Sequence, residues 1–268
     1  MRIAFLLARR VPDVPSPIML GIWRRLQGAG HAVEGWVPED RLLRTDTVHA
    51  EADLYVLKSH TEVALAYAAA LRLQGARILN DLRSCTLAQD KVTASRVLRA
   101  AGIPTPGTWL VSDPVQAAPL LGGGRLIVKP HRGHRGADVH LIGSADELAA
   151  IRMPAGPVIV QRFVPGPGED LKVYVAGDLV YAVRKPFDPM SFTRTGRPVA
   201  VSPGVRAIAM AARAAFGLEL FGIDVIESPD GPMVVDVNYF PGYKGCESPD
   251  LAIADVICRQ ARDYRWPA

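Results

Sequence analysis

Two aspartates and an asparagine near the C-terminus, Asp224, Asp236 and Asn238, are the side chains whose spacing first indicates chemistry. Each aspartate lies in a run of β-branched residues, and the turn-rich segment Glu227–Pro232 separates the two runs. This pattern predicts an antiparallel hairpin. With the turn centred on Asp230, the two aspartates face each other, and Asn238 shares their face because side chains alternate along a strand.

Carboxylates directly opposite on paired strands repel, since their Cβ atoms lie only about 4.5–5.5 Å apart. A divalent cation would compensate the repulsion, and two carboxylates with an amide oxygen suit Mg²⁺ held jointly with phosphates. The other face of the hairpin is expected to be apolar, with Val235 and Val237 joining Val225. The alternative is a solvated hairpin whose carboxylates point at water.

Composition places the chain among ordinary soluble globular proteins, with 49% apolar and 22% charged residues in 268. The formal charge of +4 comes without a basic run, so we expect no nucleic-acid partner. Three scattered cysteines favour a reducing compartment. The apolar N-terminus is too short for a signal peptide, and no apolar run reaches the roughly 18 residues that span a membrane. We therefore expect a cytoplasmic protein without a membrane partner.

The N-terminal part alternates strands with helices, which predicts a parallel α/β sheet. The expected strands are Ile3–Ala8, His31–Val37, Asp53–Lys58 and Arg77–Asn80, and the expected helices are Ile18–Gly28 and Thr61–Gln74. Ligands of such sheets gather at the carboxyl ends of strands. Arg9, Arg10, Lys58 and His60 follow such ends, so as a group they indicate an anionic small molecule, whereas each alone could be a solvated loop charge.

A glycine- and cation-rich segment, His131–Ala137, separates two expected strands in the middle of the chain, Arg125–Pro130 and Val139–Ile142. A hairpin tip of this kind can present backbone N–H groups and cations to phosphates, although a plain surface loop is the alternative. Around it we expect helices at Asp90–Ala101 and Pro119–Leu121 and a strand at Trp109–Ser112.

The second half of the chain contains a hinge candidate, Pro165–Gly168, between the expected strands Val158–Val164 and Glu169–Val175. In the latter, Asp170, Lys172 and Tyr174 share the face opposite Leu171, Val173 and Val175. The next strand, Leu179–Val183, ends in Arg184-Lys185, which indicates an anion site or a salt-bridged sheet surface. A flexible loop at Ser191–Pro198, carrying Arg194 and Arg197, and helices at Gly204–Gly217 and Ala252–Arg262 complete the expected elements.

The order of these pieces resembles the ATP-grasp superfamily from about Asn80 to Gly245. The collinear pieces are Asn80, Asp90-Lys91, Ala101–Pro106, Ile127–Pro130, the glycine-rich loop, Val160–Val164, Asp170–Val173, Gly222–Asp224 and Asp236–Asn238. The resemblance implies an α/β (α+β ATP-grasp) fold in three parts. A parallel α/β domain over residues 1–85 would precede a central subdomain with the glycine-rich loop, 86–164, and a C-terminal subdomain with the metal site, 165–268.

The resemblance also implies roles for individual residues. Lys91, Lys129 and the loop glycines Gly133 and Gly136 would contact ATP phosphates. The strand end Gln161, Arg162, Phe163 and Val164 would bind adenine through backbone groups of Arg162 and Val164, with Asp170 beside the nucleoside. Asp224, Asp236 and Asn238 would hold Mg²⁺, as two ions. Arg184 would touch the transferred phosphate or the acceptor, and Lys58, Lys172, Asn238 and Gly242 would face the acceptor. Arg184 and Lys172 are thus the candidate catalytic residues, and the strand-end cations Arg9 and Lys185, with Lys244, are further candidate contacts for a small anionic acceptor.

Three functions follow from this resemblance. The segments around Leu57-Lys58, Lys172–Gly177 and Asp236–Tyr243 are similar to the ATP-grasp inositol polyphosphate kinases, which favours γ-phosphoryl transfer to a small anionic acceptor. The N-terminal half through Ile103-Pro104 resembles glutamate ligases that modify ribosomal proteins, although those carry Glu at Asp236 and Arg at Lys172. A carboxylate–amine ligase is therefore the alternative, and a non-catalytic nucleotide-binding scaffold is the third hypothesis. Monomer and homodimer both remain open.

Overall fold

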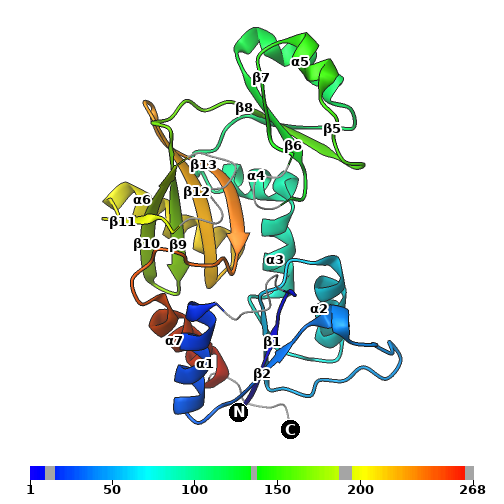
Figure 1. Ribbon diagram of the computed structural model, residues 1–268, viewed down its shortest axis with the longest axis vertical. Helices are drawn as coiled ribbons and strands as arrows, with labels where there is room; N and C mark the ends of the chain where they lie inside the picture. The colour runs from blue at the N-terminus through cyan, green and yellow to red at the C-terminus, as the bar shows by residue number, and fades with distance from the viewer. Residues whose placement is uncertain (10–15, 134–137, 187–194, 263–268) are drawn as a thin grey trace.

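The computed structural model describes residues 1–9, 16–133, 138–186 and 195–262, and it contains three β-sheets arranged along its long axis (Figure 1). The first sheet has the order β2-β1-β3-β4 and is parallel throughout, as expected. Its strands are β1 (Arg2–Leu6), β2 (Ala32–Trp36), β3 (Leu54–Leu57) and β4 (Ile78–Leu79). All four residues of β3 are buried, which is typical of a parallel strand covered on both faces.

Helices α1 (Pro17–Gly28) and α2 (Glu62–Leu73) accompany this first sheet, together with a short 3₁₀ helix, η1 (Pro38–Asp40). Each α-helix begins at a hydroxyl cap: Ser16 accepts from the Met19 amide at 3.2 Å, and Thr61 accepts from the Ala64 amide at 3.2 Å. The expected helices at Ile18–Gly28 and Thr61–Gln74 are thus present with shifts of one residue.

The second sheet is antiparallel, in the order β5-β8-β6-β7. It consists of β5 (Thr108–Val111), β6 (Leu126–Pro130), β7 (His140–Ile142) and β8 (Val158–Arg162), with η2 (Pro114–Gly123) and α5 (Ala145–Ala150) on one face. The face toward η2 and α5 forms its own small core, which consists of Ala117, Leu126, Val128, Ile142, Leu148, Val158 and Val160. This sheet therefore packs as a separate body at the upper end of Figure 1.

The third sheet is also antiparallel, in the order β11-β10-β9-β12-β13. Its elements are β9 (Glu169–Ala176), β10 (Leu179–Pro186), β11 (Arg197–Val199), β12 (Leu220–Ser228) and β13 (Gly231–Tyr239), with α6 (Pro203–Phe216) and α7 (Pro249–Arg262) packed against β9. Its core is continuous with that of the first sheet. Helix α7 packs on α1, where Arg25 and Asp250 form an ion pair at 2.6 Å.

Asn80 joins the first and third sheets through a side chain that is 1% exposed. Its Oδ1 accepts from the amides of Glu219 and Leu220 at 2.8 and 2.9 Å, and its Nδ2 donates to the Leu220 carbonyl at 2.7 Å. The next two helices, α3 (Leu82–Gln89) and α4 (Lys91–Ala100), run between the sheets (Figure 1). The first and third sheets are therefore fastened together, while the second has a separate core.

Some elements differ from the sequence-based expectations. Helix α3 was not expected, and the predicted helix at Pro119–Leu121 is part of the 3₁₀ helix η2. The predicted loop at Ser191–Pro198 is wrong at its end, because Arg197–Val199 pairs with β10 as strand β11. Ser191–Arg194 lie outside the described residues. Across the described part of the chain, no helix has the length and apolar character required to span a bilayer.

Candidate active site

The hairpin of β12 and β13 has the register predicted for it, since Asp224 pairs with Asp236 and Gly222 pairs with Asn238. Asn238 therefore shares the carboxylate face, as expected. Val235 does not join Val225, because the register shifts beside Asp224 and the fully buried Val234 takes that place. An extra residue in one strand interrupts strict alternation, and here it turns the Val235 carbonyl toward the site.

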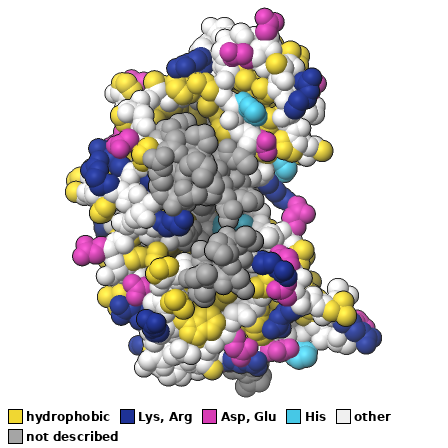
Figure 2. All heavy atoms as spheres, in the orientation of Figure 1, with side chains coloured by type: hydrophobic (Ala, Val, Ile, Leu, Met, Phe, Trp, Pro, Cys, Tyr) yellow, Lys and Arg dark blue, Asp and Glu magenta, His cyan; other side chains and the backbone are white. Residues whose placement is uncertain are grey.

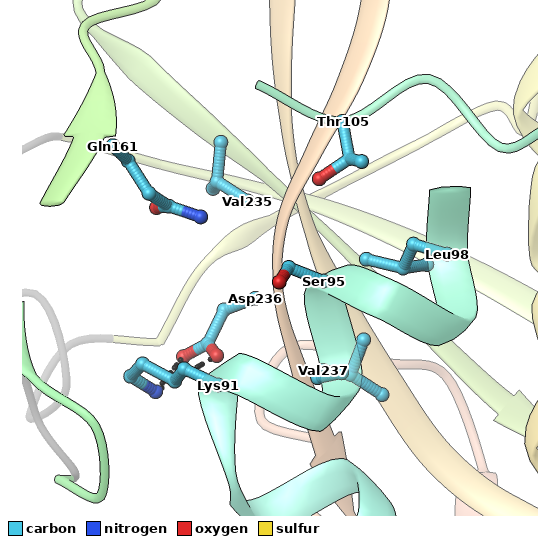
Figure 3. A pocket seen from close by; sticks show the side chains of 9 residues that line it. Lys91, Ser95, Leu98, Thr105, Gln161, Val235, Asp236 and Val237 are labelled. Atoms are coloured by element: carbon cyan, nitrogen blue, oxygen red, sulfur yellow. Dashed lines mark hydrogen bonds and ion pairs between the residues drawn. The ribbon is translucent and has the colours of Figure 1, made fainter. Parts of the chain in front are cut away.

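Lysines from two other elements neutralise the opposed carboxylates. Lys91, the first residue of α4, places its Nζ 2.9 and 3.1 Å from the carboxylate oxygens of Asp236 (Figure 3). Lys172 of β9 donates to Asp224 at 2.6 Å and lies 3.0 Å from Asp170. The predicted repulsion is thus compensated by ammonium groups, and the face of Asp170 and Lys172 is the one expected from the alternation of β9.

The donor set fits a magnesium ion that shares its coordination with phosphates. Asp224, Asp236 and Asn238 offer only oxygen donors suited to Mg²⁺, and the side chain of Asn238 makes no hydrogen bond to another described residue. Within the described ranges no three or more His, Cys, Asp or Glu side chains cluster as a self-sufficient metal site. Nucleotide oxygens would therefore complete the coordination, and the assignment of these ligands stays a prediction.

Lys129 of β6 is a buried cation at the centre of the site, with 7% of its surface exposed. Its Nζ donates to the Val235 carbonyl at 3.2 Å. Burial lowers the pKa of Lys129 to about 8, although the carboxylates of Asp236 and Asp224 oppose that shift. A lysine in this environment is stabilised by any anion that enters, and phosphate oxygens are such anions.

The pKa shifts of the neighbouring groups describe the same balance. Burial alone would lower the pKa of Lys172, but Asp224 and Asp170 outweigh it and raise the value. Burial would raise the pKa of Asp236, yet Lys91 and Lys129 hold it below its ordinary value. Burial and the charge of Asp224 raise the pKa of Asp170. The cluster is thus a set of closely spaced opposite charges with little water around it.

The register of β9 and β10 decides which strand-end cation reaches the site. Lys185 pairs with Asp170 and therefore shares the face of the site, whereas Arg184 pairs with Leu171 and lies on the opposite face. There Arg184 forms an ion pair with Glu227 at 2.7 Å. The structure thus places Lys185, an expected acceptor contact, on the face of the site and Arg184, an expected catalytic residue, on the opposite face, and the role of each stays a prediction.

Lys185 is 4% exposed, and no described residue forms an ion pair with its ammonium group. Burial and the charges of Lys172 and Lys244 lower its pKa. A nearly buried cation that has like-charged neighbours, no ion pair with a described residue and only a partial offset from Asp224 indicates an anionic ligand.

The expected adenine hinge follows β8. The Arg162 amide donates to the Gly107 carbonyl at 2.9 Å, so this N–H is engaged within the protein. The Arg162 side chain donates to carbonyls of Leu120 and Gly124, away from the site. The amide of Val164 makes no main-chain hydrogen bond to a described residue outside the regular ladders. Of the two amides among the expected contacts, that of Val164 is the one that this geometry leaves for a nucleobase.

A small hollow between α4, β8 and β13 adjoins the Lys91–Asp236 pair (Figure 3). It is lined by Ser95 and Leu98 of α4, by Val235 and Val237 of β13, by Gln161 of β8, and by Thr105 between α4 and β5. Gln161 is held by a bond from its Nε2 to the Thr108 hydroxyl at 3.1 Å. Gly133 adjoins Pro130 at the start of the glycine-rich loop, and Gly136 lies outside the described residues.

The expected acceptor residues are only partly brought together. Arg9 forms an ion pair with Asp40 and its side chain is 68% exposed, so the structure does not add it to the cluster. Arg10 lies outside the described residues. Lys58 instead contacts the backbone of Phe240 and Pro241, just before Gly242 and Lys244.

A compositional signal that sequence reasoning missed connects these residues. The chain has 31 lysines and arginines, and six of them are lysines. All six lie in the site or contact the loop that leaves it: Lys58, Lys91, Lys129, Lys172, Lys185 and Lys244. On the face drawn in Figure 2, basic and acidic side chains are interspersed. Lysine adjusts its pKa when buried more readily than arginine, which suits a compact, partly dehydrated phosphate site.

Comparisons with known proteins agree with this geometry. The model of the RimK-like ATP-grasp domain matches residues 88–259, which is more than half of the chain. A protein of Sodalis glossinidius named "Probable alpha-L-glutamate ligase" is 33% identical over 199 residues, which cover 68% of this chain and 67% of that relative. A second relative, "Probable alpha-L-glutamate ligase 2" of Shewanella amazonensis, is 29% identical over 224 residues, 76% of this chain and 74% of its own.

Two solved structures share the fold over nearly the whole chain. A RimK domain ATP-grasp protein from Sphaerobacter thermophilus has a TM-score of 0.75 at 22% identity and covers 96% of this chain and 100% of its own. The D-cycloserine synthetase DcsG has a TM-score of 0.74 at 20% identity, with 97% and 100% coverage. The expected ATP-grasp fold is thereby confirmed.

Proposed function

Because the chain belongs to the RimK-like ATP-grasp family, we propose that it is a Mg²⁺- and ATP-dependent ligase that joins a carboxylate to an amine. The sequence favoured a kinase, with the ligase as its alternative. The named relatives are glutamate ligases, and they support the alternative over the kinase. ATP-grasp ligases use ATP and Mg²⁺ in general, and we retain two ions as part of the proposal.

The observation that carries the proposal is the buried cation group around Lys129, which faces two opposed carboxylates at the hairpin. Lys91 and Lys129 would bind the phosphates of ATP, since their ammonium groups surround the Val235–Asp236 segment from two sides. Asp224, Asp236 and Asn238 would hold Mg²⁺, which neutralises charge on the γ-phosphoryl group when bound. Lys172, which pairs with Asp224 and Asp170 beside these ligands, would stabilise charge on the reacting oxygens.

The reaction divides into two displacements. An acceptor carboxylate oxygen attacks the γ-phosphorus, the bond to the β–γ bridging oxygen breaks, and ADP leaves. The amine then attacks the acyl carbon of the resulting acyl phosphate, inorganic phosphate leaves, and the amine releases a proton as the amide forms. Lys185, with its buried ammonium on the face of the site, would hold the acceptor carboxylate in line.

A product assay tests the proposal. Because the named relatives are glutamate ligases, glutamate is the first compound to test, both as the amine and as the carboxylate. We expect ADP and phosphate in equal amounts, only when carboxylate and amine are both present. Hydroxylamine in place of the amine should trap the acyl phosphate as a hydroxamate. Retention of the γ-phosphate on a polyol phosphate would instead support the kinase, and tight ATP binding without turnover of any acceptor would support a scaffold.

A further inference from the structure

Three consecutive residues after β3 contact three consecutive residues at the end of β13. Lys58 donates from Nζ to the carbonyls of Phe240 and Pro241 at 3.0 and 3.2 Å. The Tyr239 hydroxyl donates to the Ser59 carbonyl at 2.7 Å. The His60 ring stacks on Tyr239, with the ring centroids 3.9 Å apart. We call these six residues, Lys58–His60 and Tyr239–Pro241, the interdomain clamp.

Lys58 holds a backbone conformation that the loop would not adopt easily alone. Phe240 has a φ of 34° and Tyr243 a φ of 49°, both in the left-handed region that side chains other than glycine disfavour. The Lys58 ammonium also lies 4.4 Å from the centroid of the Phe240 ring. At the far end, the buried Tyr243 donates to the Val175 carbonyl at 2.5 Å. The loop is thus held at both ends by side chains that are far from it in sequence.

The position of the clamp gives it a consequence for the reaction. Asn238, an expected metal ligand, immediately precedes it, and Gly242 and Lys244, expected acceptor contacts, immediately follow it. We propose that the clamp, through Lys58, is a positioning device that sets the acceptor loop Gly242–Lys244 relative to the metal-bound phosphates. The inference rests on the proposed function, and it replaces the expectation that Lys58 binds the acceptor itself.

In this role the first sheet contributes to catalysis by positioning the acceptor loop, and it does so without binding ATP itself. Asn80 already fastens that sheet to the start of β12, and the clamp fastens it to the end of β13. Both strands of the metal hairpin are therefore positioned from the same neighbouring sheet. Because misplacement of reacting groups by about 1 Å can lower a rate by roughly 100-fold, a loosened loop should impair the reaction strongly.

The kinetic test compares Lys58→Met with Lys58→Arg. We expect Lys58→Met to lower kcat/KM for the acceptor by about 10- to 100-fold and to lower kcat as well, while the KM for ATP stays within about twofold. Lys58→Arg should recover most of the loss, since its guanidinium can donate to both carbonyls. Arg44→Met is the matched control, because Arg44 pairs with Asp46 on an exposed loop outside the site and should leave the kinetics unchanged.

A second readout distinguishes positioning from direct binding. Cys246 is bonded through its amide to the Tyr243 carbonyl and is partly buried, whereas Cys85 and Cys258 are buried elsewhere. Iodoacetamide labelling, mapped by mass spectrometry, should be at least about fivefold faster at Cys246 in Lys58→Met and unchanged at the other two cysteines. If Lys58→Met does not fold, Tyr239→Phe removes the hydroxyl that donates to Ser59 and Gln89 and should give the same pattern with a smaller amplitude.

Two results would overturn the clamp. Impaired acceptor kinetics with unchanged Cys246 labelling would make Lys58 a direct acceptor ligand, and equal acceleration at all three cysteines would make it a general stability residue. The labelling needs no turnover, so it tests the clamp even if the wild-type protein ligates no carboxylate to any amine. In that case the proposed function fails, and the positioning of the loop is judged by Cys246 alone.

Discussion

Replacement of Lys129 by methionine should stabilise the nucleotide-free protein while it weakens ATP binding. The two effects have one cause, because the ammonium group is held in a nearly buried position before any phosphate arrives. Methionine has a similar length and no charge. The substitution therefore removes the cost of burying a cation and, at the same time, the group that the phosphates would neutralise.

The size of the stabilising effect follows from the pKa of Lys129. A shift from 10.5 to about 8 corresponds to about 3 kcal/mol against the charged form in the folded protein. The bond from Nζ to the Val235 carbonyl is lost, which costs about 1 kcal/mol. Asp236 keeps its ion pair with Lys91 but loses a second favourable charge. We expect a net gain of about 1–2 kcal/mol at pH 7.

The stability gained by Lys129→Met should depend on pH. Because the folded pKa of Lys129 lies below its unfolded value, its unfavourable contribution is fully present below pH 8 and is relieved as the pH rises toward 10.5. The stability difference between Lys129→Met and the wild type should therefore shrink over that interval. Urea denaturation at several pH values measures it.

Isothermal titration with ATP measures the other half of the prediction. We expect affinity to fall by at least about tenfold in Lys129→Met, since one charge-assisted contact to phosphate is worth about 1.5–3 kcal/mol. Arg44→Met serves again as the matched control, because its guanidinium pairs with Asp46 on an exposed loop outside the charged cluster. A variant that is destabilised by several kcal/mol but binds ATP normally would refute the reasoning and make Lys129 a structural support for Val235.

The remaining predictions concern the charges and the junction between sheets. Asp236→Asn should lower turnover by at least about 100-fold and change ATP affinity little, and wild-type rates would remove the metal assignment. Lys185→Met should raise the KM for the acceptor by at least about tenfold, whereas Arg184→Met, on the opposite face, should not; the reverse order would contradict the register argument. ATP affinity should decline above about pH 8, by up to about tenfold per pH unit, because binding then requires proton uptake by Lys129, and Lys129→Arg should abolish the decline. Asn80→Ala should lower the free energy of unfolding by about 3 kcal/mol, measured in urea, because three buried hydrogen bonds lose their partner.

The sequence by itself determined the elements and the carboxylate face. Alternation and turn chemistry act over a few residues, so the pairing of Asp224 with Asp236 could be read from local patterns. The collinear ATP-grasp motifs allowed the fold to be predicted for the same reason, since each motif is a short strand or loop. Helix α3 was missed because it is short and polar, and packing against its neighbours contributes to its stability.

Only the tertiary structure decided which charges meet. Lys91, Lys172 and Asp236 come from three elements far apart in the chain, and no local pattern specifies that two ammonium groups will occupy the carboxylates. A difference of one position on β10 inverts the face, so the choice of Lys185 over Arg184 depended on the register with β9. The folded chain also places Lys58 on the backbone of Phe240 and Pro241, a contact that no local pattern predicts, while its expected role at the acceptor stays a prediction. Charge and residue type are local properties, whereas burial and partnership are set by the packing of distant segments.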